Sequence, residues 1–106
     1  MGWFDFLSGP RIDRGVSEFR ETPGAVLLDV RTPREYREGH IPGSVNVPLQ
    51  SLDREGAVPA GKDVPLFVCC HSGARSSQAT EILTRMGYAN VENIGGIAAY
   101  TGKVER

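Results

Sequence analysis

The sequence lacks an excess of charge of one sign, a long hydrophobic run and a cluster of metal-binding side chains. Its 106 residues include 12 basic and 13 acidic side chains mixed along the chain, so no basic stripe indicates a nucleic-acid partner. No apolar run approaches the ~20 residues of a membrane-spanning helix, so we expect no membrane span. The two histidines and two cysteines lack the spacing of zinc ligands, so we expect no metal.

The chain is too short for two ordinary domains, and 40% of its residues are hydrophobic, which predicts one core. Residues 1–10, MGWFDFLSGP, combine large apolar side chains with Asp5, a composition that does not fit a signal peptide. We expect this apolar segment to pack on a single domain formed by residues 11–106, with a weak interfacial anchor as the alternative. The cytoplasm, where thiols stay reduced, is the expected location.

Hydrophobic patterns predict an α/β fold with a central parallel sheet. Residues 25–30 and 65–70 are continuous apolar runs, as expected of strands covered on both faces. Shorter candidate strands lie at residues 44–47 and 90–94, each bounded by Gly, Pro or Asn. We therefore expect four to five strands with helices on both faces of the sheet.

Three helices are predicted around these strands. Apolar side chains at helical spacing indicate helices over residues 12–19 and 75–86, although Gly15 weakens the first. The stretch TPREYREG after the first strand predicts a short helix in which Thr32 and Glu35 form a capping box. Its final glycine supplies a left-handed stop.

The stretch FVCCHSGARSS, residues 67 to 77, contains both cysteines next to each other. Adjacent Cα atoms are only ~3.8 Å apart, shorter than the ~4.4–6.8 Å of relaxed disulfides, so a bridge between Cys69 and Cys70 is disfavoured. Five residues separate Cys69 from Arg75, the loop length of cysteine phosphatases, whereas four separate Cys70 from Arg75. The spacing alone leaves open which cysteine is the nucleophile.

Ligands of parallel sheets bind beyond the carboxyl ends of the strands, and both Asp29 and Cys70 fall at such ends. The short connection HSGA leads from Cys70 into a helix, so its backbone N–H groups and the helix N-terminus form a cradle for an anion. A cysteine at the mouth of this cradle should have a lowered pKa. The sequence therefore predicts a thiolate nucleophile.

The side chains of this loop have more than one interpretation. Arg75 can hold a bound oxyanion or a carboxylate that braces the loop, and both roles remain open. Gly73 provides a sharp backbone bend, and His71 is expected to line the entrance. Ser72 and Ser76 can donate to an anion, although capping the helix is the favoured interpretation.

Three separated motifs resemble the signature regions of the rhodanese domain. They are LLDVRTPREYREGHIPGSVNVP, CHSGARSSQA and GYANVENIGGIAAY, at residues 27–48, 70–79 and 87–100. The resemblance implies a rhodanese-like fold over residues 11–106 and a sulfurtransferase that takes sulfane sulfur from thiosulfate or a persulfide donor as a cysteine persulfide. Cyanide or a thiol, either a low-molecular-weight thiol or a thioredoxin-like protein, would accept the sulfur. No metal or organic cofactor is implied.

Aligned with the family, the nucleophile falls on Cys70, followed by a persulfide-binding loop. The loop comprises His71, Ser72, Gly73, Ala74, Arg75 and Ser76. Neighbouring strand residues point to opposite sides, so Cys69 is interpreted as a core residue, with a redox role as the alternative. His71, Ala74 and Tyr100 depart from the usual family residues and bear on substrate preference.

Further residues at family positions are expected to support this loop. Asp29 and Arg31 are two apart on one strand, which favours a structural ion pair over direct catalysis. Glu35 completes the capping box. Gly95 and Gly96 match a double glycine beside the active site, where another loop approaches closely. His40 is interpreted as a turn residue rather than a general base.

Two alternatives to a sulfurtransferase enzyme remain. The first is a sulfur-relay or regulatory module that binds another protein, because such a module shares every motif. The second is an arsenate reductase or phosphatase, in which the longer loop from Cys69 to Arg75 would hold a tetrahedral oxyanion. Only the loop length favours this second alternative.

Overall fold

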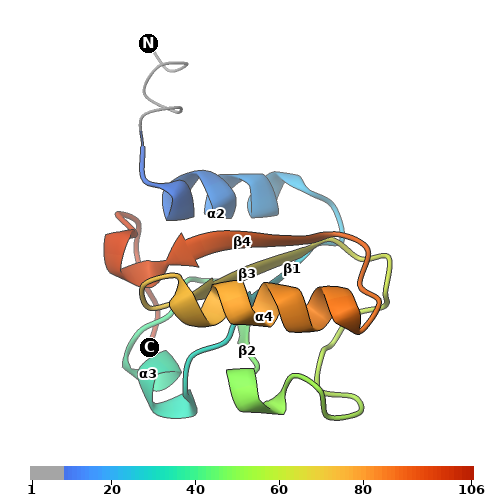
Figure 1. Ribbon diagram of the computed structural model, residues 1–106. Coiled ribbons are helices and arrows are strands. Elements are labelled where there is room, and N and C mark those ends of the chain that lie inside the picture. Colours follow the sequence, from blue (N-terminus) through green and yellow to red (C-terminus); the bar gives the residue numbers. More distant parts are fainter. Residues whose placement is uncertain (1–8) are drawn as a thin grey trace.

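A computed structural model describes residues 9–106 and shows four parallel strands flanked by helices (Figure 1). The strands lie in the order β2-β1-β3-β4, which confirms the predicted parallel sheet. Their bounds are Val26–Asp29 for β1, Ser44–Asn46 for β2, Leu66–Cys70 for β3 and Val91–Gly96 for β4. The predicted packing of residues 1–10 falls almost entirely outside the described residues and stays a prediction.

The two longer helices cover opposite faces of the sheet, as predicted. Helix α2, Arg11–Glu21, lies on one face, and α4, Ala74–Arg85, lies on the other (Figure 1). Helix α3 spans Pro33–Glu38, and two short 3-10 helices, η1 and η2, span Leu49–Ser51 and Ile97–Ala99. Within residues 9–106, no helix is both long and apolar enough to cross a membrane.

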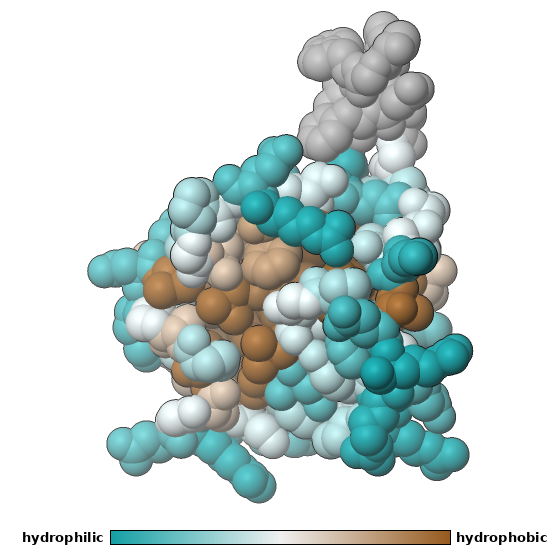
Figure 2. Space-filling model, turned by 180° about the vertical axis from the view of Figure 1, so that it is seen from behind, coloured by the Kyte–Doolittle hydropathy of each residue, from teal (hydrophilic) through white to brown (hydrophobic). Residues whose placement is uncertain are grey.

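Strand alternation divides the buried side chains between two cores. The core on the α4 side contains Leu28, Val68 and Cys70, whereas the core on the α2 side contains Phe67 and Cys69. Figure 2 shows the molecule from behind, where apolar side chains gather toward the middle of the face and polar side chains surround them. The two adjacent cysteines therefore occupy different chemical environments.

Helix α2 lies unusually close to the sheet at Gly15. A Cβ added at Gly15 would lie 2.3 Å from the Ile94 Cβ, so no larger residue fits there without movement. The sequence interpretation of Gly15 as a weak point of the helix is therefore incomplete. The glycine lowers helix propensity, but it permits the close contact between α2 and β4.

The connection after β1 follows the predicted pattern at its start and differs at its end. The Thr32 hydroxyl accepts a hydrogen bond from the Glu35 N–H, and the Glu35 carboxylate accepts one from the Thr32 N–H, which confirms the capping box. Gly39 ends the helix with φ 157° and ψ 131°, so the predicted left-handed helical conformation is wrong, although the positive φ still favours glycine. The next residue, His40, pairs with Glu105 in an antiparallel bridge.

Candidate active site

The candidate site lies at the carboxyl end of the sheet, where β3 ends at Cys70 and α4 begins at Ala74. Gly73 joins the two with φ 107° and ψ -14°, a left-handed conformation that favours glycine. The turn brings the Gly73 N–H back to the sulfur, and it donates a hydrogen bond to Cys70 Sγ at 2.9 Å. The loop thus closes around the sulfur itself.

The environment of Cys70 favours the thiolate form. Cys70 is 1% exposed, and this burial raises the pKa of its thiol. The Ser76 hydroxyl, 3.5 Å from Sγ, and the backbone N–H groups of Ser76, Gly73 and Ser72 lower the pKa and outweigh burial. The net result is a pKa below the ordinary value, which favours the thiolate, the nucleophilic form of the side chain.

Cys69 has the opposite environment. Its side chain is fully buried in the core on the α2 side. Burial, followed by the negative charge of Asp29, raises the pKa of this thiol far above its ordinary value. A thiol that stays protonated is a poor nucleophile, so the geometry argues against a catalytic loop that starts at Cys69.

Arg75 forms a bidentate ion pair with Glu35 across the loop. Its Nη1 lies 2.7 Å from Oε1 and its Nη2 lies 2.9 Å from Oε2. The hydrogen bonds from Arg75 lower the pKa of Glu35 to about 2, with further lowering by Thr32. Of the two roles open for Arg75, the structure shows the bracing contact. Glu35 therefore does more than complete the capping box, because it ties α3 to the start of α4.

Asp29 and Arg31 form a buried ion pair behind the loop. Arg31 Nη2 lies 2.8 Å from Asp29 Oδ2, and the same nitrogen donates to the Gly39 carbonyl at 2.7 Å. The Asp29 side chain is fully buried and that of Arg31 is 6% exposed. Both groups are committed to protein partners, which fits a structural role in holding the segment after β1.

The double glycine lets β4 approach the loop. A Cβ on Gly96 would lie 2.2 Å from the His71 carbonyl oxygen and 2.5 Å from the Ser72 Cα. The Ala98 N–H then donates to that same His71 oxygen at 3.0 Å. Gly95 has φ 99°, so its backbone also favours glycine. The end of β4 thus forms one wall against the backbone of the loop.

Other predicted residues lie at the surface of the site or away from it. His71, Ser72 and Ala74 are exposed around the loop. His40 stacks on Tyr36 with ring centroids 3.8 Å apart, and its Nδ1 lies 2.8 Å from the Tyr36 carbonyl. These contacts suit the predicted turn residue. Among the described residues, no three His, Cys, Asp or Glu side chains are grouped as metal ligands.

Two asparagines of the site were not identified from the sequence. Asn93 Oδ1 accepts hydrogen bonds from the Ser76 hydroxyl at 2.7 Å and from the Gly95 N–H at 2.9 Å. Asn46 Nδ2 donates to the backbone carbonyls of Asp29 and Arg31, each at 2.9 Å. The available signal was a polar residue within a predicted strand, where a side chain that turns out to be buried requires a hydrogen-bond partner.

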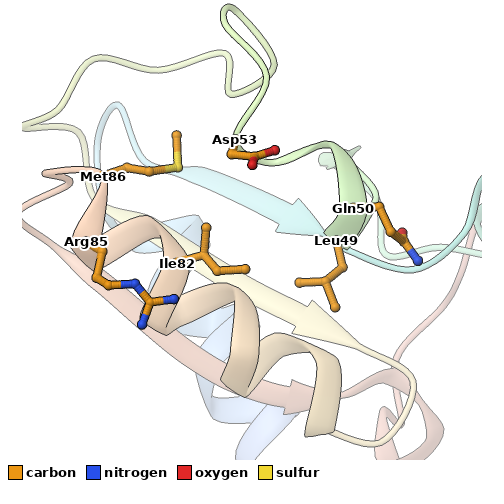
Figure 3. A pocket seen from close by; sticks show the side chains of 6 residues that line it. All are labelled: Leu49, Gln50, Asp53, Ile82, Arg85 and Met86. Carbon is orange, nitrogen blue, oxygen red and sulfur yellow. The ribbon is translucent and has the colours of Figure 1, made fainter.

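A pocket of about 500 Å³ lies elsewhere, between the η1 region and the C-terminal half of α4 (Figure 3). The residues that line it are Leu49, Gln50, Asp53, Ile82, Arg85 and Met86. None of the predicted site residues is among them, whereas the Cys70 loop leads into the N-terminal end of α4. We therefore assign the chemistry to the loop and not to this pocket.

The sheet and the cysteine loop define an α/β domain that holds a thiol next to the N-terminus of a helix. The sequence profile of the rhodanese-like domain family matches residues 15–103. The chain belongs to this family, as the three motifs and the four-stranded fold predicted.

Similar proteins include named sulfurtransferases. Thiosulfate sulfurtransferase PspE of Escherichia coli (strain K12) is 41% identical over 71 residues, which cover 66% of this chain and 68% of PspE. Thiosulfate sulfurtransferase GlpE of Pseudoalteromonas translucida is 31% identical over 99 residues, 84% of this chain and 89% of GlpE. A solved structure described as a rhodanese with anions from E. coli has a TM-score of 0.69 and 37% identity, covering 77% of this chain and 98% of its own. The relatives support sulfur transfer in general terms.

Proposed function

We propose that the protein is a sulfurtransferase that carries sulfane sulfur on Cys70 as a persulfide. The observation that carries the proposal is the contact between Cys70 Sγ and the Gly73 N–H at 2.9 Å, within a loop that lowers the pKa of this thiol. A thiolate surrounded by N–H donors is suited to attack sulfur and to hold a negatively charged product. Family membership gives the reaction class.

With thiosulfate as donor, the Cys70 thiolate attacks the outer sulfur. A new S–S bond forms, the S–S bond of thiosulfate breaks, and its electron pair leaves with sulfite. The outer sulfur of the persulfide can carry negative charge, which the backbone N–H groups of Ser72 and Gly73 would stabilise. In the second half-reaction an acceptor thiolate or cyanide takes that sulfur, and the electron pair returns to Cys70. Neither step requires a metal or an organic cofactor.

The donor and the acceptor are part of the proposal. Thiosulfate or a persulfide supplies the sulfur, and a low-molecular-weight thiol or a thioredoxin-like protein receives it. The cytoplasm, where thiols stay reduced, remains the predicted location. That nucleic acid is not a partner also stays a prediction from the balanced charge.

The test is intact mass spectrometry of the wild-type protein and two cysteine variants after incubation with thiosulfate. The wild type and Cys69→Ser should gain one sulfur atom that a reducing thiol removes, whereas Cys70→Ser should gain none. Loading of Cys70→Ser, or loss of loading in a folded Cys69→Ser, would refute the assignment of the nucleophile.

The same samples separate the enzyme from its alternatives. A turnover enzyme discharges its persulfide rapidly to small thiols, whereas a relay module loads but discharges slowly until a protein acceptor is added. If no variant gains sulfur from thiosulfate or from a persulfide donor, the sulfurtransferase proposal fails. Arsenate and aryl phosphate would then be tested with Cys69→Ser as the critical variant.

A further inference from the structure

Asn93 lies on β4 beside the Cys70 loop, and two hydrogen bonds fix its side chain. Oδ1 accepts one from the Gly95 N–H at 2.9 Å and one from the Ser76 hydroxyl at 2.7 Å. The Gly95 N–H can only donate, so the side-chain atom that faces it must be the amide oxygen. An amide oxygen can only accept, so the Ser76 hydroxyl must donate its proton to Asn93.

Ser76 has one hydroxyl proton, and three acceptors surround it. Asn93 Oδ1 lies at 2.7 Å, the Gly73 carbonyl oxygen at 3.0 Å and Cys70 Sγ at 3.5 Å. Ser76 is fully buried, so bulk water does not relieve this competition. The contact to Asn93 is the shortest of the three. While the sulfur is a neutral thiol, the proton therefore points to Asn93 and a lone pair of Ser76 Oγ faces Cys70, whereas a thiolate competes with Asn93 for the same proton.

This orientation affects the two charge states of the sulfur differently. A neutral thiol donates its own proton to Ser76 Oγ, whereas a thiolate or persulfide anion needs the Ser76 proton for itself. We propose that Asn93 is a positioning residue that, by holding the single Ser76 proton, restrains how readily the Cys70 sulfur carries negative charge. The inference deepens the proposed function and rests on Cys70 as its nucleophile.

The other charged and titratable groups around Cys70 come from β1 and its extension, β3, the loop, α3 and α4. They are Asp29, Arg31, Cys69, His71, Glu35 and Arg75. The four charged members form the two ion pairs described above, so they hold each other in place. Asn93 touches none of these groups in its two hydrogen bonds, which allows its effect to be measured separately.

The test follows the ultraviolet absorbance of the Cys70 thiolate against pH, in a Cys69→Ser background and without any sulfur donor. Asn93→Ala should move the midpoint of the Cys70 thiolate titration to lower pH, because the substitution leaves the Ser76 proton free to donate to the sulfur. Iodoacetamide should then alkylate Cys70 about three- to tenfold faster at mildly acidic pH, the equivalent of about one hydrogen bond. In a Ser76→Ala background, Asn93→Ala should have no effect. An equal shift in both backgrounds, or no shift in either, would overturn the proposal.

Asn93→Asp provides a second measurement, which decides the matter if Asn93→Ala does not fold. The substituted side chain keeps an acceptor for Ser76 and for the Gly95 N–H but holds the Ser76 proton more tightly. The pH midpoint of the Cys70 thiolate titration should rise. The rise should be larger in the protein that keeps Ser76 than in the Ser76→Ala background. Equal rises would reflect the added charge alone and refute the role of Asn93. Because no donor is used, these outcomes are independent of whether Cys70 loads with sulfur.

Discussion

Replacing Gly96 with alanine should disable the candidate site by displacing the backbone of its loop. The added Cβ would lie 2.2 Å from the His71 carbonyl oxygen, more than 1 Å inside ordinary contact, which begins at 3.4 Å. The Ser72 Cα, at 2.5 Å, blocks a second direction of relief. Because all of these neighbours are backbone atoms, no rotamer change can remove the overlap, and the loop or β4 must move by about 1 Å.

The expected magnitude has two parts. Overpacking of this kind lowers the free energy of unfolding by about 1–3 kcal/mol. That loss corresponds to a melting temperature lower by about 4 °C or more in a domain of this size. Misplacing a reacting group by ~1 Å costs about 10²-fold in rate. We therefore expect sulfur loading of Cys70, followed by intact mass at a temperature where the variant is folded, to slow by about that factor.

Two other glycines serve as matched controls. Gly95→Ala introduces strain, because Gly95 has φ 99°, but its Cβ would meet nothing within 4 Å. It should lower stability by about 1–3 kcal/mol and leave the loading rate of the folded protein within a few-fold of wild type. Gly61→Ala meets nothing within 4 Å and should be neutral within about 0.5 kcal/mol. Wild-type stability and loading in Gly96→Ala would refute the close approach of β4 to the loop.

Two further predictions concern stability. The pKa of Glu35 is about 2 in the folded protein and lies below its ordinary value of 4.5. The Glu35–Arg75 contribution should therefore be complete above about pH 4.5 and lost as pH falls toward 2. Urea unfolding of the wild type and of Glu35→Gln, which keeps the capping box, should be measured across that pH range. The free energy of unfolding should fall more for the wild type than for Glu35→Gln as the pH is lowered. An equal fall in both proteins would show that the ion pair contributes nothing. Gly15→Ala should destabilise the fold despite a gain of about 1 kcal/mol in helix propensity, because its Cβ would lie 2.3 Å from the Ile94 Cβ. A higher melting temperature would contradict the close packing of α2.

Short-range physics accounts for the parts of the site that the sequence predicted well. The capping box of Thr32 and Glu35 depends only on the spacing of two residues in one helical turn. Asp29 and Arg31 form the predicted ion pair, although β1 ends at Asp29 and Arg31 lies two residues beyond it. Strand alternation placed Cys69 and Cys70 in different cores. Each of these inferences required the type of local structure and no knowledge of distant contacts.

Contacts between distant segments could not be predicted in the same way. The bracing carboxylate of Arg75 is Glu35, which lies 40 residues earlier in the chain. Many acidic residues were equally available as partners before the fold was known. Gly15 was interpreted from helix propensity alone, because its contact with Ile94 depends on how α2 lies on the sheet. The link from Asn93 to Ser76 likewise depends on the packing of β4 against α4.

The distribution of charge in the site favours sulfur over phosphorus as the transferred atom. Both arginines beside the loop are committed to carboxylates, Arg31 to Asp29 and Arg75 to Glu35. The negative charge of Cys70 is therefore stabilised by neutral donors, chiefly the Ser76 hydroxyl and backbone N–H groups. A persulfide adds one atom that carries at most a single charge, which such donors can hold. A transferring phosphoryl group spreads charge over three oxygens and relies on cationic clamps, and the arginine that could supply one already holds Glu35.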